Sequence, residues 1–422
     1  MHSVTNAIPT GTIASIPAKA HAHRALICAA LASSPSTILL SRTSKDIDAT
    51  MDSLRGLGAH VVYENKVVTV TPGPVPAKGN VVPHESGTTL RLLLPVAASI
   101  CNDVDVDAKG RLPDRPLEPM LSEMKAHGVT FSQDKPPFTM TGRLQGGNFS
   151  MVGDVSSQFF SGLLLAAPQI GLSTITSTTP LQSSDYVTLT TETMRDFGVE
   201  VEHTLPDTNI NEAFTVPFGA SFIGRDNYQI EGDWSNAAIW MVAAGMTGKP
   251  ITITGMNKNS VQADRRIMQV MIDAGCDVVW DGMNVTVTGR ASKPIHADLE
   301  QMPDMLPVMA ALACSISGES SFVKGARLRL KESDRLIAVA NLVRDLGGTV
   351  REEGDDLYII GSGILKGGHG DCVNDHRLVM AGTLMALISE NPVTLQDSEA
   401  ITKSYPDFFE DWNLLGGDAH GI

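Results

Sequence analysis

The chain repeats one pattern of apolar and polar positions. An amphipathic helix closes on glycine, a strand rich in Val or Thr follows, and a polar turn leads into a second strand. Helical periodicity that gives way to two alternating runs around a turn indicates a helix followed by a β-hairpin. The copies span 54–70, 124–140, 194–203, 271–287 and 342–360, and a last helix spans 408–417.

The glycines that close these helices are evenly spaced. Glycine suits the left-handed backbone conformation in which many helices end. Successive closing glycines lie 69 to 77 residues apart, so six units of similar length fill the chain and internal duplication governs its architecture. These residues are Gly58, Gly128, Gly198, Gly275, Gly347 and Gly416.

The ends of the repeated pattern predict the domain organisation. The last copy stops at its glycines without a hairpin, so we expect the leading segment 5–17 to supply a strand to it. Both termini would then belong to one domain, and the chain would cross between domains near Pro17 and near Glu231. The sequence therefore predicts an α/β protein with one domain at 18–230 and a second built from 1–17 plus 231–422.

Composition and charge limit the partners. The chain has 422 residues, 42% of them hydrophobic, which is enough to bury large cores. A net charge of −15 argues against a broad basic face for nucleic acid, so any anion must bind in a local cationic pocket. No apolar run approaches the roughly 20 residues of a membrane-spanning helix.

The cysteines indicate a reducing compartment. Cys28, Cys101, Cys276, Cys314 and Cys372 are scattered without C-x-x-C spacing, and their odd number leaves one over in any disulfide scheme. The first residues lack the basic and apolar regions of a signal peptide. We therefore expect a cytoplasmic protein with reduced, buried thiols.

Several predicted helices begin with residues that can cap a helix or bind an anion. Ser, Asp, Asn or Gly precedes a long apolar run in HESGTTLRLLL, DVSSQFFSGLLL, EGDWSNAAIW, MPDMLPVMAA and VNDHRLVMAG. Such residues cap the first N–H groups, and helix starts can also hold phosphate or carboxylate. Stacked repeats would bring these starts together on one side of each domain.

The densest charged segment is RLRLKESDRL, residues 327–336. Arg327 and Arg329 alternate with leucines, which predicts a strand end, and helical spacing begins at Leu336. Lys331, Glu332 and Arg335 would then occupy a strand-to-helix junction. The simpler alternative is a solvated, capped helix start.

Other cations and polar donors recur at similar places. Arg377 lies just inside a predicted helix start and Lys403 precedes the last helix, while Arg115 lies in a Pro-bounded loop. Ser156, Ser157 and Gln158 are neutral donors whose simplest role is capping.

The segment SIPAKAHAHRAL, residues 15–26, crowds Lys19, His21, His23 and Arg24 together. Histidines two apart face different sides of a helix, whereas a shared metal face needs spacings of three or four, so a metal site is disfavoured. The interleaved aromatics of a nucleic-acid surface are missing as well. Anion binding by Lys19 and Arg24 remains, and the histidines are expected to pack or to be solvated.

Taken together, the motifs resemble the 5-enolpyruvylshikimate-3-phosphate synthase family over nearly the whole chain. They occur in the family's order and at about its spacings, and the joint occurrence of SSQF, KESDR and NDHR is highly specific. In chain order the motifs are PAKAHAHR, ESGTTLR, DRP, SSQF, SSDY, EGDWS, MPD, LRLKESDR, NDHR and KSYPDFFE.

The resemblance implies two similar domains, each of three α/β units (an inverse α/β barrel), joined by a two-stranded hinge. It implies a monomer that transfers the enolpyruvyl group of phosphoenolpyruvate to the 5-hydroxyl of shikimate 3-phosphate and releases phosphate. The cleft between the domains is expected to close on the substrates. No metal or organic cofactor is expected.

The resemblance also assigns substrate contacts. The residues implied for phosphoenolpyruvate are Lys19, Gly87, Arg115, Gln158, Arg335, Arg377 and Lys403. Those implied for shikimate 3-phosphate are Lys19, Ala20, Arg24, Ser156, Ser157, Gln158, Ser183, Tyr186, Asp304, Arg327 and Lys331.

The catalytic residues implied by the resemblance are Asp304, Lys331, Glu332 and Lys19. Glu332 would protonate and later deprotonate the methylene carbon, and Asp304 would act as the base near the hydroxyl, with Lys331 beside it. The two carboxyl groups would need environments that separate their pKa values. How the proton transfers divide among Asp304, Lys331 and Glu332 stays open at the level of sequence.

Two positions depart from the family pattern. Ala20 stands where the family usually has a serine that donates to the shikimate side, and Arg327 stands where the family can have asparagine. We expect activity with weakened or redistributed shikimate 3-phosphate contacts. Gly87 keeps the small residue associated with glyphosate binding, so inhibition is expected.

Two rival functions remain. An enolpyruvyl transferase acting on UDP-N-acetylglucosamine shares the fold but carries a cysteine in the loop before Arg115, and DAKGRLPDR contains none. A non-catalytic homologue is suggested by Ala20, but retention of the other charged residues argues against it.

Overall fold

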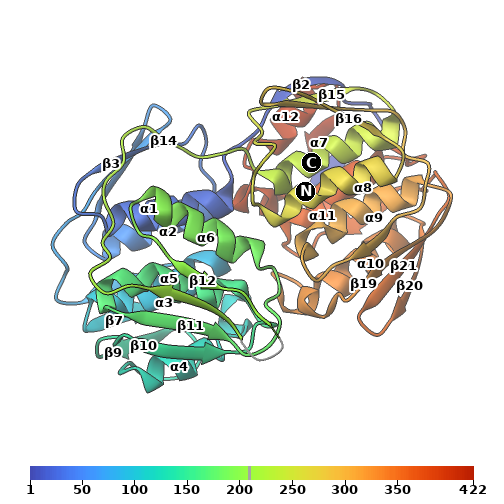
Figure 1. Cartoon of the computed structure of the whole chain (residues 1–422). Coiled ribbons are helices and arrows are strands. Elements are labelled where there is room, and N and C mark those ends of the chain that lie inside the picture. Colours follow the sequence, from blue (N-terminus) through green and yellow to red (C-terminus); the bar gives the residue numbers. More distant parts are fainter. Residues whose placement is uncertain (208–210) are drawn as a thin grey trace. The chain divides into compact units, whose positions relative to one another are not determined.

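The computed structural model describes residues 1–207 and 211–422, and the chain divides into two compact units. The inserted unit is Pro17–Ile230, and the terminal unit combines Met1–Ile16 with Glu231–Ile422 (Figure 1). Each unit has a hydrophobic core built from its own residues. The structural division places Pro17 in the inserted unit, one residue away from the boundary expected from sequence.

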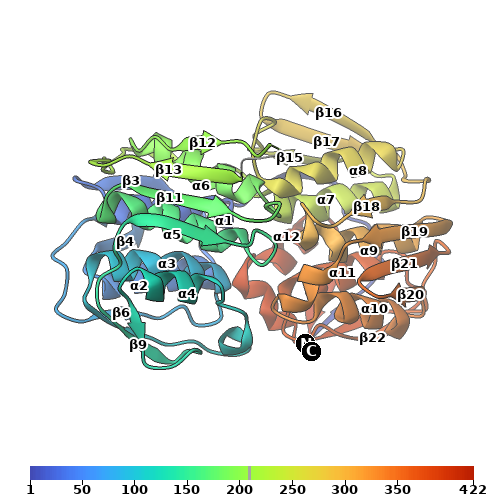
Figure 2. The same ribbon diagram turned by 60° about the horizontal axis from the view of Figure 1, so that its bottom comes forward.

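Both units repeat one sheet design. The residues that the structure describes form six four-stranded sheets, and in each a parallel pair is followed by two antiparallel strands. The sheets lie outside the helices, as the labelled strands β11–β13 and β16–β17 show in Figure 2. The fold is therefore the two-domain inverse α/β barrel, with three repeats per domain.

The sheets of the inserted unit, in spatial order, are β14 (Tyr228–Gln229), β3 (Ser36–Leu39), β5 (Val67–Thr71), β4 (His60–Glu64); β6 (Gly79–Val81), β7 (Asp103–Val106), β9 (Phe138–Thr141), β8 (Thr130–Phe131); and β10 (Gly147–Met151), β11 (Ser173–Ser177), β13 (Glu212–Val216), β12 (Glu202–Thr204). Those of the terminal unit are β2 (Gly11–Ala14), β15 (Ile251–Thr254), β17 (Asn284–Thr288), β16 (Asp277–Asp281); β18 (His296–Asp298), β19 (Gly318–Val323), β21 (Asp356–Gly361), β20 (Thr349–Glu353); and β22 (Gly368–Asp371), β23 (Val393–Gln396), β1 (His2–Val4), β24 (Ala419–Gly421).

Each repeat carries an inner and an outer helix. The inner helices are the long apolar runs of the sequence and lie in the core: all ten residues of α9 are buried, for example. They are α1 (Lys19–Ala30), α3 (Gly87–Ile100), α5 (Ser157–Ile170), α7 (Trp234–Thr247), α9 (Leu306–Ser315) and α11 (His376–Ala386). The outer, amphipathic helices are α2 (Lys45–Gly56), α4 (Met120–Ala126), α6 (Asp185–Asp196), α8 (Ile267–Asp273), α10 (Arg335–Asp345) and α12 (Phe408–Leu414).

The glycine prediction is confirmed. Each of the six closing glycines follows an outer helix and has a φ between +88° and +102°. Residues with a Cβ rarely adopt this conformation. The even spacing of these glycines therefore corresponds to the structural repeat.

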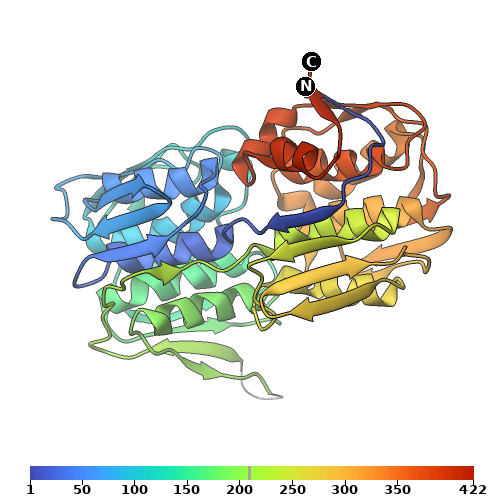
Figure 3. The same ribbon diagram turned by 90° about the horizontal axis from the view of Figure 1, so that it is seen from above.

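The expectation for the last repeat is partly wrong. A strand, β24, does follow the last glycines, and it pairs with β1, so the two ends of the chain lie side by side (Figure 3). The strand that joins the last sheet is β1, which lies before the expected segment 5–17. The strand within 5–17 is β2, and it joins the sheet of β15 instead. β24 reads AHG, which has no β-branched residue, so its sequence does not indicate a strand.

The inner helices pack closely enough to bring their first turns together. A Cβ on Gly162 of α5 would lie 2.5 Å from the carbonyl oxygen of Arg91 in α3, so only glycine permits this approach. The expected clustering of helix starts is seen at α3 and α5, where Gln158 hydrogen-bonds both Thr88 and Arg91.

Candidate functional site

Lys19 opens the first inner helix of the inserted unit. Its Nζ lies 2.8 Å from the Asp46 carboxylate, in the first turn of α2, and its side chain keeps 18% of its exposure. The pair orients the ammonium group at the helix start without removing it from solvent. Ala20 follows, half-buried, in the same first turn.

Arg24 lies deeper in the same helix and is only 2% exposed. Its guanidinium donates to the carbonyls of Ala20 (2.7 Å) and Tyr186 (2.9 Å) and to the hydroxyls of Thr190 (2.7 Å) and Ser161 (3.3 Å). Burial lowers its pKa to about 10. The structure thus shows Arg24 joining α1 to α5 and α6.

Gly87 and Arg115 are in direct contact. Arg115 follows the 3₁₀ helix η1 (Leu112–Asp114), and its guanidinium lies over the Cα of Gly87, the first residue of α3. A Cβ at position 87 would lie 2.8 Å from Arg115 Cζ and still closer to Nη1. The glycine therefore leaves room for the guanidinium.

The start of α5 presents the SSQ segment. Ser156 is the N-cap, and its hydroxyl accepts from the Gln158 amide at 3.3 Å. The Gln158 side chain donates to Thr88 (2.9 Å) and accepts from Arg91 (3.2 Å). Gln158 is thus held beside Gly87 from two sides. Arg91, although it ends the motif ESGTTLR, was not predicted as a site residue.

Ser183 and Tyr186 lie at the start of α6. Ser183 is 2% exposed and has a φ of +54°, which is unusual for a residue other than glycine. Tyr186 contributes its carbonyl to Arg24. Such a conformation is found often at functional sites.

The histidines pack, as expected. His21 Nε2 lies 2.8 Å from the Tyr228 hydroxyl, which donates to Asp196, so His21 carries its proton on Nε2. His23 Nδ1 lies 2.7 Å from the hydroxyl of Thr50. Burial lowers the pKa of His21 to about 4 and that of His23 well below its usual value, so both are neutral at pH 7.

In the terminal unit, the strand end expected at 327–330 is wrong. Residues Ala326–Leu330 form the 3₁₀ helix η4, and α10 begins at Arg335 after the N-cap Asp334. Leu328 is buried but Leu330 is 43% exposed, so the alternation of Arg and Leu does not correspond to two faces of a strand. A 3₁₀ helix has three residues per turn, and two leucines spaced two apart are too few to show this period in the sequence.

Arg335 organises three carboxylates. It is 1% exposed and donates to Asp375 (2.9 and 3.2 Å), Glu332 (2.6 Å) and Asp304 (2.7 Å). Burial opposes its charge, but Asp375, Glu332 and Asp304 outweigh burial and raise its pKa. In this structure Arg335 therefore holds the two predicted catalytic carboxylates rather than facing solvent.

Asp304 and Lys331 form an ion pair within the cluster. Asp304 lies in the 3₁₀ helix η3 (Pro303–Met305), 3.1 Å from Lys331 Nζ and 3.6 Å from Arg377 Nη2. Burial would raise the pKa of Asp304, but Lys331, Arg377 and Arg335 hold it well below its usual value. Burial lowers the pKa of Lys331 to about 8, so it is close to releasing its proton.

Two further cations flank this cluster. Arg377 is the second residue of α11, after the N-cap Asp375 and His376. Lys403 ends η5 (Ser398–Lys403), and its Nζ lies 2.7 Å from the Asn374 carbonyl. Val373 has a φ of +41°, which is strained for a β-branched residue, and Asn374 has a φ of +54°. The carbonyl of Asn374 points toward Lys403. Asp375, inside NDHR, belongs to this cluster through Arg335, and the sequence analysis did not assign it.

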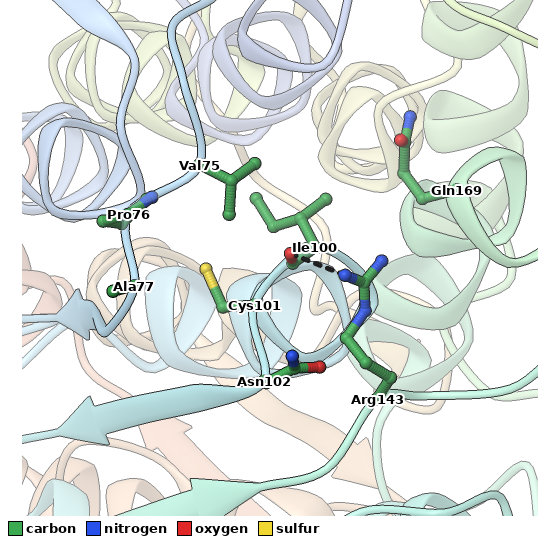
Figure 4. A pocket seen from close by; sticks show the side chains of 8 residues that line it. All are labelled: Val75, Pro76, Ala77, Ile100, Cys101, Asn102, Arg143 and Gln169. Carbon is green, nitrogen blue, oxygen red and sulfur yellow. Dashed lines mark hydrogen bonds between the residues drawn. The ribbon is translucent and has the colours of Figure 1, made fainter.

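A hollow of about 390 Å³ in the inserted unit is separate from these residues (Figure 4). It is lined by Cys101, Asn102 and Arg143, among others, at the end of α3 remote from Gly87. Arg143 donates to the carbonyls of Ser99 and Ile100 and so caps that helix end.

Two kinds of site are not found in the described part of the chain. Within residues 1–207 and 211–422, no three His, Cys, Asp or Glu side chains are grouped so that they could hold a metal. Over the same residues, no helix combines the length and apolar character needed to cross a membrane.

The geometry gives two sets of residues suited to anions. In the inserted unit, Lys19, Arg115 and Gln158 lie near inner helix starts, which favour phosphate and carboxylate groups. In the terminal unit, cations hold two carboxyl groups: Asp304 lies 3.1 Å from Lys331 Nζ, and Glu332 lies 2.6 Å from Arg335 Nη2. Such an arrangement can neutralise an anionic substrate and move protons.

Known proteins resemble the chain over its whole length. The sequence model of the family described as EPSP synthase (3-phosphoshikimate 1-carboxyvinyltransferase) matches residues 7–412. A 3-phosphoshikimate 1-carboxyvinyltransferase of Clostridium kluyveri is 36% identical over 95% of this chain and 94% of its own length. One of Methanocorpusculum labreanum is 35% identical over 97% of both chains. EPSP synthase of Acinetobacter baumannii, 22% identical, superposes with a TM-score of 0.80 over 100% of this chain and 99% of its own.

Proposed function

The chain belongs to the EPSP synthase (3-phosphoshikimate 1-carboxyvinyltransferase) family, a family of transferases, and we propose that it transfers the enolpyruvyl group of phosphoenolpyruvate to the 5-hydroxyl of shikimate 3-phosphate, releasing phosphate. The observation that carries the proposal is the cluster of Asp304, Lys331, Glu332 and Arg335. It combines two half-buried carboxyl groups with cations in one network around the buried Arg335.

The residue types fit the substrates. Phosphoenolpyruvate and shikimate 3-phosphate bring two phosphates and two carboxylates together, and their repulsion must be neutralised. We assign phosphoenolpyruvate to Lys19, Gly87, Arg115, Gln158, Arg335, Arg377 and Lys403. We assign shikimate 3-phosphate to Lys19, Ala20, Arg24, Ser156, Ser157, Gln158, Ser183, Tyr186, Asp304, Arg327 and Lys331.

The burial of Arg24 and Arg335 limits how each of them could contact a substrate. Both guanidinium groups already have several protein acceptors, and each is at most 2% exposed. Arg24 would reach shikimate 3-phosphate with its remaining Nη1 hydrogen. Arg335 would act mainly by holding Asp304 and Glu332, and would contact phosphoenolpyruvate only after one of these carboxylates moved.

The pKa shifts of Asp304 and Lys331 support a division of proton transfers. Asp304 is held ionised by its cations, which suits a base that accepts the proton of the 5-hydroxyl. Lys331, with a pKa of about 8, is mostly protonated at pH 7, so it can donate a hydrogen bond that holds the hydroxyl in place, and only its neutral form can take up the proton from Asp304. Glu332 would add a proton to the methylene carbon of phosphoenolpyruvate and remove one as phosphate leaves.

A phosphate-release assay tests the function directly. We expect turnover with phosphoenolpyruvate plus shikimate 3-phosphate and none with phosphoenolpyruvate plus UDP-N-acetylglucosamine. Turnover with the UDP-sugar alone would make the rival transferase the correct assignment. No release with either acceptor would favour a non-catalytic homologue.

The Ala20→Ser substitution tests the departure from the family pattern. We expect KM for shikimate 3-phosphate to fall by roughly 2- to 10-fold, because one added hydrogen bond contributes about 0.5–1.5 kcal/mol. The KM for phosphoenolpyruvate should stay the same and serves as the internal control. Unchanged affinity for shikimate 3-phosphate would show that alanine at position 20 does not weaken the binding of this substrate.

The Gly87→Ala substitution tests the contact with Arg115. The added methyl group overlaps the guanidinium, so we expect KM for phosphoenolpyruvate to rise by roughly 10- to 100-fold, the loss of a charge-assisted hydrogen bond. We also expect the unsubstituted enzyme to be inhibited by glyphosate and the variant to resist it.

A double-mutant cycle identifies the cause of the Gly87→Ala effect. If the methyl group acts by displacing Arg115, Gly87→Ala and Arg115→Lys together should cost less than the sum of the two single changes. Additive effects would mean that the methyl group acts on the ligand alone. Insensitivity of the unsubstituted enzyme to millimolar glyphosate would contradict the assignment of Gly87.

We further propose that the enzyme acts as a monomer in the cytoplasm. The five cysteines are all free and buried, which fits a reducing compartment. All residues assigned to the two substrates belong to this one chain.

A further inference from the structure

Four buried side chains of the inserted unit, His23, Thr50, Thr89 and Ser86, form a hydroxyl network to which the family resemblance gives no role. His23 Nδ1 lies 2.7 Å from the Thr50 hydroxyl, which lies 2.7 Å from that of Thr89. Thr89 donates to Ser86 Oγ (2.8 Å) and to the Asp46 carbonyl (3.3 Å). All four side chains are at most 1% exposed, so each depends on the others for its hydrogen bonds.

The hydroxyl network joins the helices on both sides of the Lys19 ion pair. Lys19 and His23 are four residues apart in α1 and so share one face of that helix. Asp46 and Thr50 have the same spacing in α2. The two helices therefore meet through two contacts one turn apart, the ion pair of Lys19 and the hydrogen bond of His23. Thr89 then ties both helices to α3.

The first turn of α3 holds several residues assigned to phosphoenolpyruvate. Gly87 lies under the guanidinium of Arg115. The hydroxyl of Thr88 accepts from Gln158 (2.9 Å), and Thr89, the next residue, holds the backbone of α2. One helical turn thus makes contact with three separate parts of the candidate site.

We propose that the hydroxyl network positions the Lys19 ammonium group for phosphoenolpyruvate, with Thr89 as its central residue. Thr89 acts through Asp46, whose carbonyl accepts from Thr89 and whose carboxylate accepts from Lys19. Without the hydroxyl of Thr89, the first turn of α2 loses its tie to α3, and the carboxylate that orients Lys19 can shift. The proposal rests on the proposed function, since it takes Lys19 as a phosphoenolpyruvate contact.

The hydrogen atoms of the hydroxyl network have one consistent direction. The Asp46 carbonyl can only accept, so the single hydroxyl hydrogen of Thr89 is directed toward Asp46 and Ser86. Thr50 must then donate to Thr89, and the His23 ring must donate to Thr50 from Nδ1. Burial lowers the pKa of His23 well below its usual value, so the ring carries one proton at pH 7. Its Nε2, which has no partner among the described residues, is then a lone pair and not an unpaired N–H.

The Thr89→Val variant removes the hydroxyl and keeps the branched shape. We expect KM for phosphoenolpyruvate to rise roughly 2- to 10-fold, the effect of one lost hydrogen bond, with a smaller change in kcat. Thr89→Ser keeps the hydroxyl and should restore the KM of the unsubstituted enzyme. A Thr89→Val enzyme with unchanged KM for phosphoenolpyruvate would overturn the proposal.

A double-mutant cycle separates positioning from a general loss of stability. Because Thr89 acts through Asp46, adding Thr89→Val to Asp46→Asn should raise KM for phosphoenolpyruvate little further, and additive effects would overturn the proposal. Thr193→Val in α6 is the matched control, since it removes a buried hydroxyl that donates to the Leu189 carbonyl (2.7 Å). It should lower stability without changing KM. An equal rise in KM for Thr193→Val would also overturn the proposal.

The tautomer of His23 gives a test on the unsubstituted protein should the variants fail to fold. We expect ¹⁵N NMR of the labelled histidines to show His23 protonated on Nδ1 and unprotonated on Nε2 at pH 7. A proton on Nε2 would break the hydroxyl network and overturn the proposal. This measurement needs no turnover, whereas absence of phosphate release by the unsubstituted enzyme would instead refute the proposed function.

Discussion

Replacing Glu332 by Gln is expected to lower kcat by roughly 10²- to 10⁴-fold, the usual contribution of a positioned acid or base. The amide has nearly the same shape and its oxygen can still accept from Arg335 Nη2, now 2.6 Å from the carboxylate. It can neither deliver a proton to the methylene carbon nor remove one. The loss should therefore fall on the chemical step and not on substrate binding.

Single-turnover rates of phosphate release are the measurement for Glu332→Gln, with KM values for both substrates determined alongside. Glu319→Gln on strand β19 is a matched control, since that carboxylate is half-exposed and pairs with Arg351, which is not part of the cluster. A Glu332→Gln enzyme with kcat within tenfold of wild type would assign the carbon protonation to another group.

Replacing Arg335 by Met should destabilise the terminal unit by roughly 3–5 kcal/mol, the usual cost of removing one partner of a buried ion pair. Asp375, which is fully buried, would keep hydrogen bonds from the Ser333 hydroxyl (3.0 Å) and the Arg377 amide (3.0 Å) but would lose its guanidinium partner. Activity should fall as well, because Asp304 and Glu332 lose their shared donor. Denaturant unfolding followed by tryptophan fluorescence measures the first effect.

The double variant Arg335→Met with Asp375→Asn distinguishes the mechanism. The amide removes the unpaired charge and still caps α11, so part of the lost stability should return. Arg344→Met is the control: its pair with Glu352 is largely exposed and should contribute less than about 1 kcal/mol. Equal losses for Arg335→Met and Arg344→Met would contradict the role of the buried network.

The repeat could be predicted from sequence because it depends on local chemistry. Gly58 and its five equivalents are required by the backbone conformation that ends each outer helix, and this requirement acts within a few residues. The family motifs are likewise short and contiguous. The sheet of the last repeat was predicted less well, because β24 has no strand-forming residues and gains its structure only by pairing with β1.

The candidate site shows the same limit. Lys331, Glu332 and Arg335 are adjacent in sequence, so their joint involvement could be predicted. Asp46 and Arg91 come from other elements, and only folding places them beside Lys19 and Gln158. No local pattern of the sequence marks Asp46, and the motif ESGTTLR includes Arg91 without assigning it a contact with Gln158.

The sequence by itself determined the six repeats, the family and the identity of the charged groups, since these depend on residue type and spacing along the chain. The tertiary structure alone decided that Arg335 is enclosed by Asp375, Glu332 and Asp304, that Arg115 lies over Gly87, and that the pKa of Lys331 is about 8. Burial and the distances between charges, which set these properties, exist only once the elements have packed.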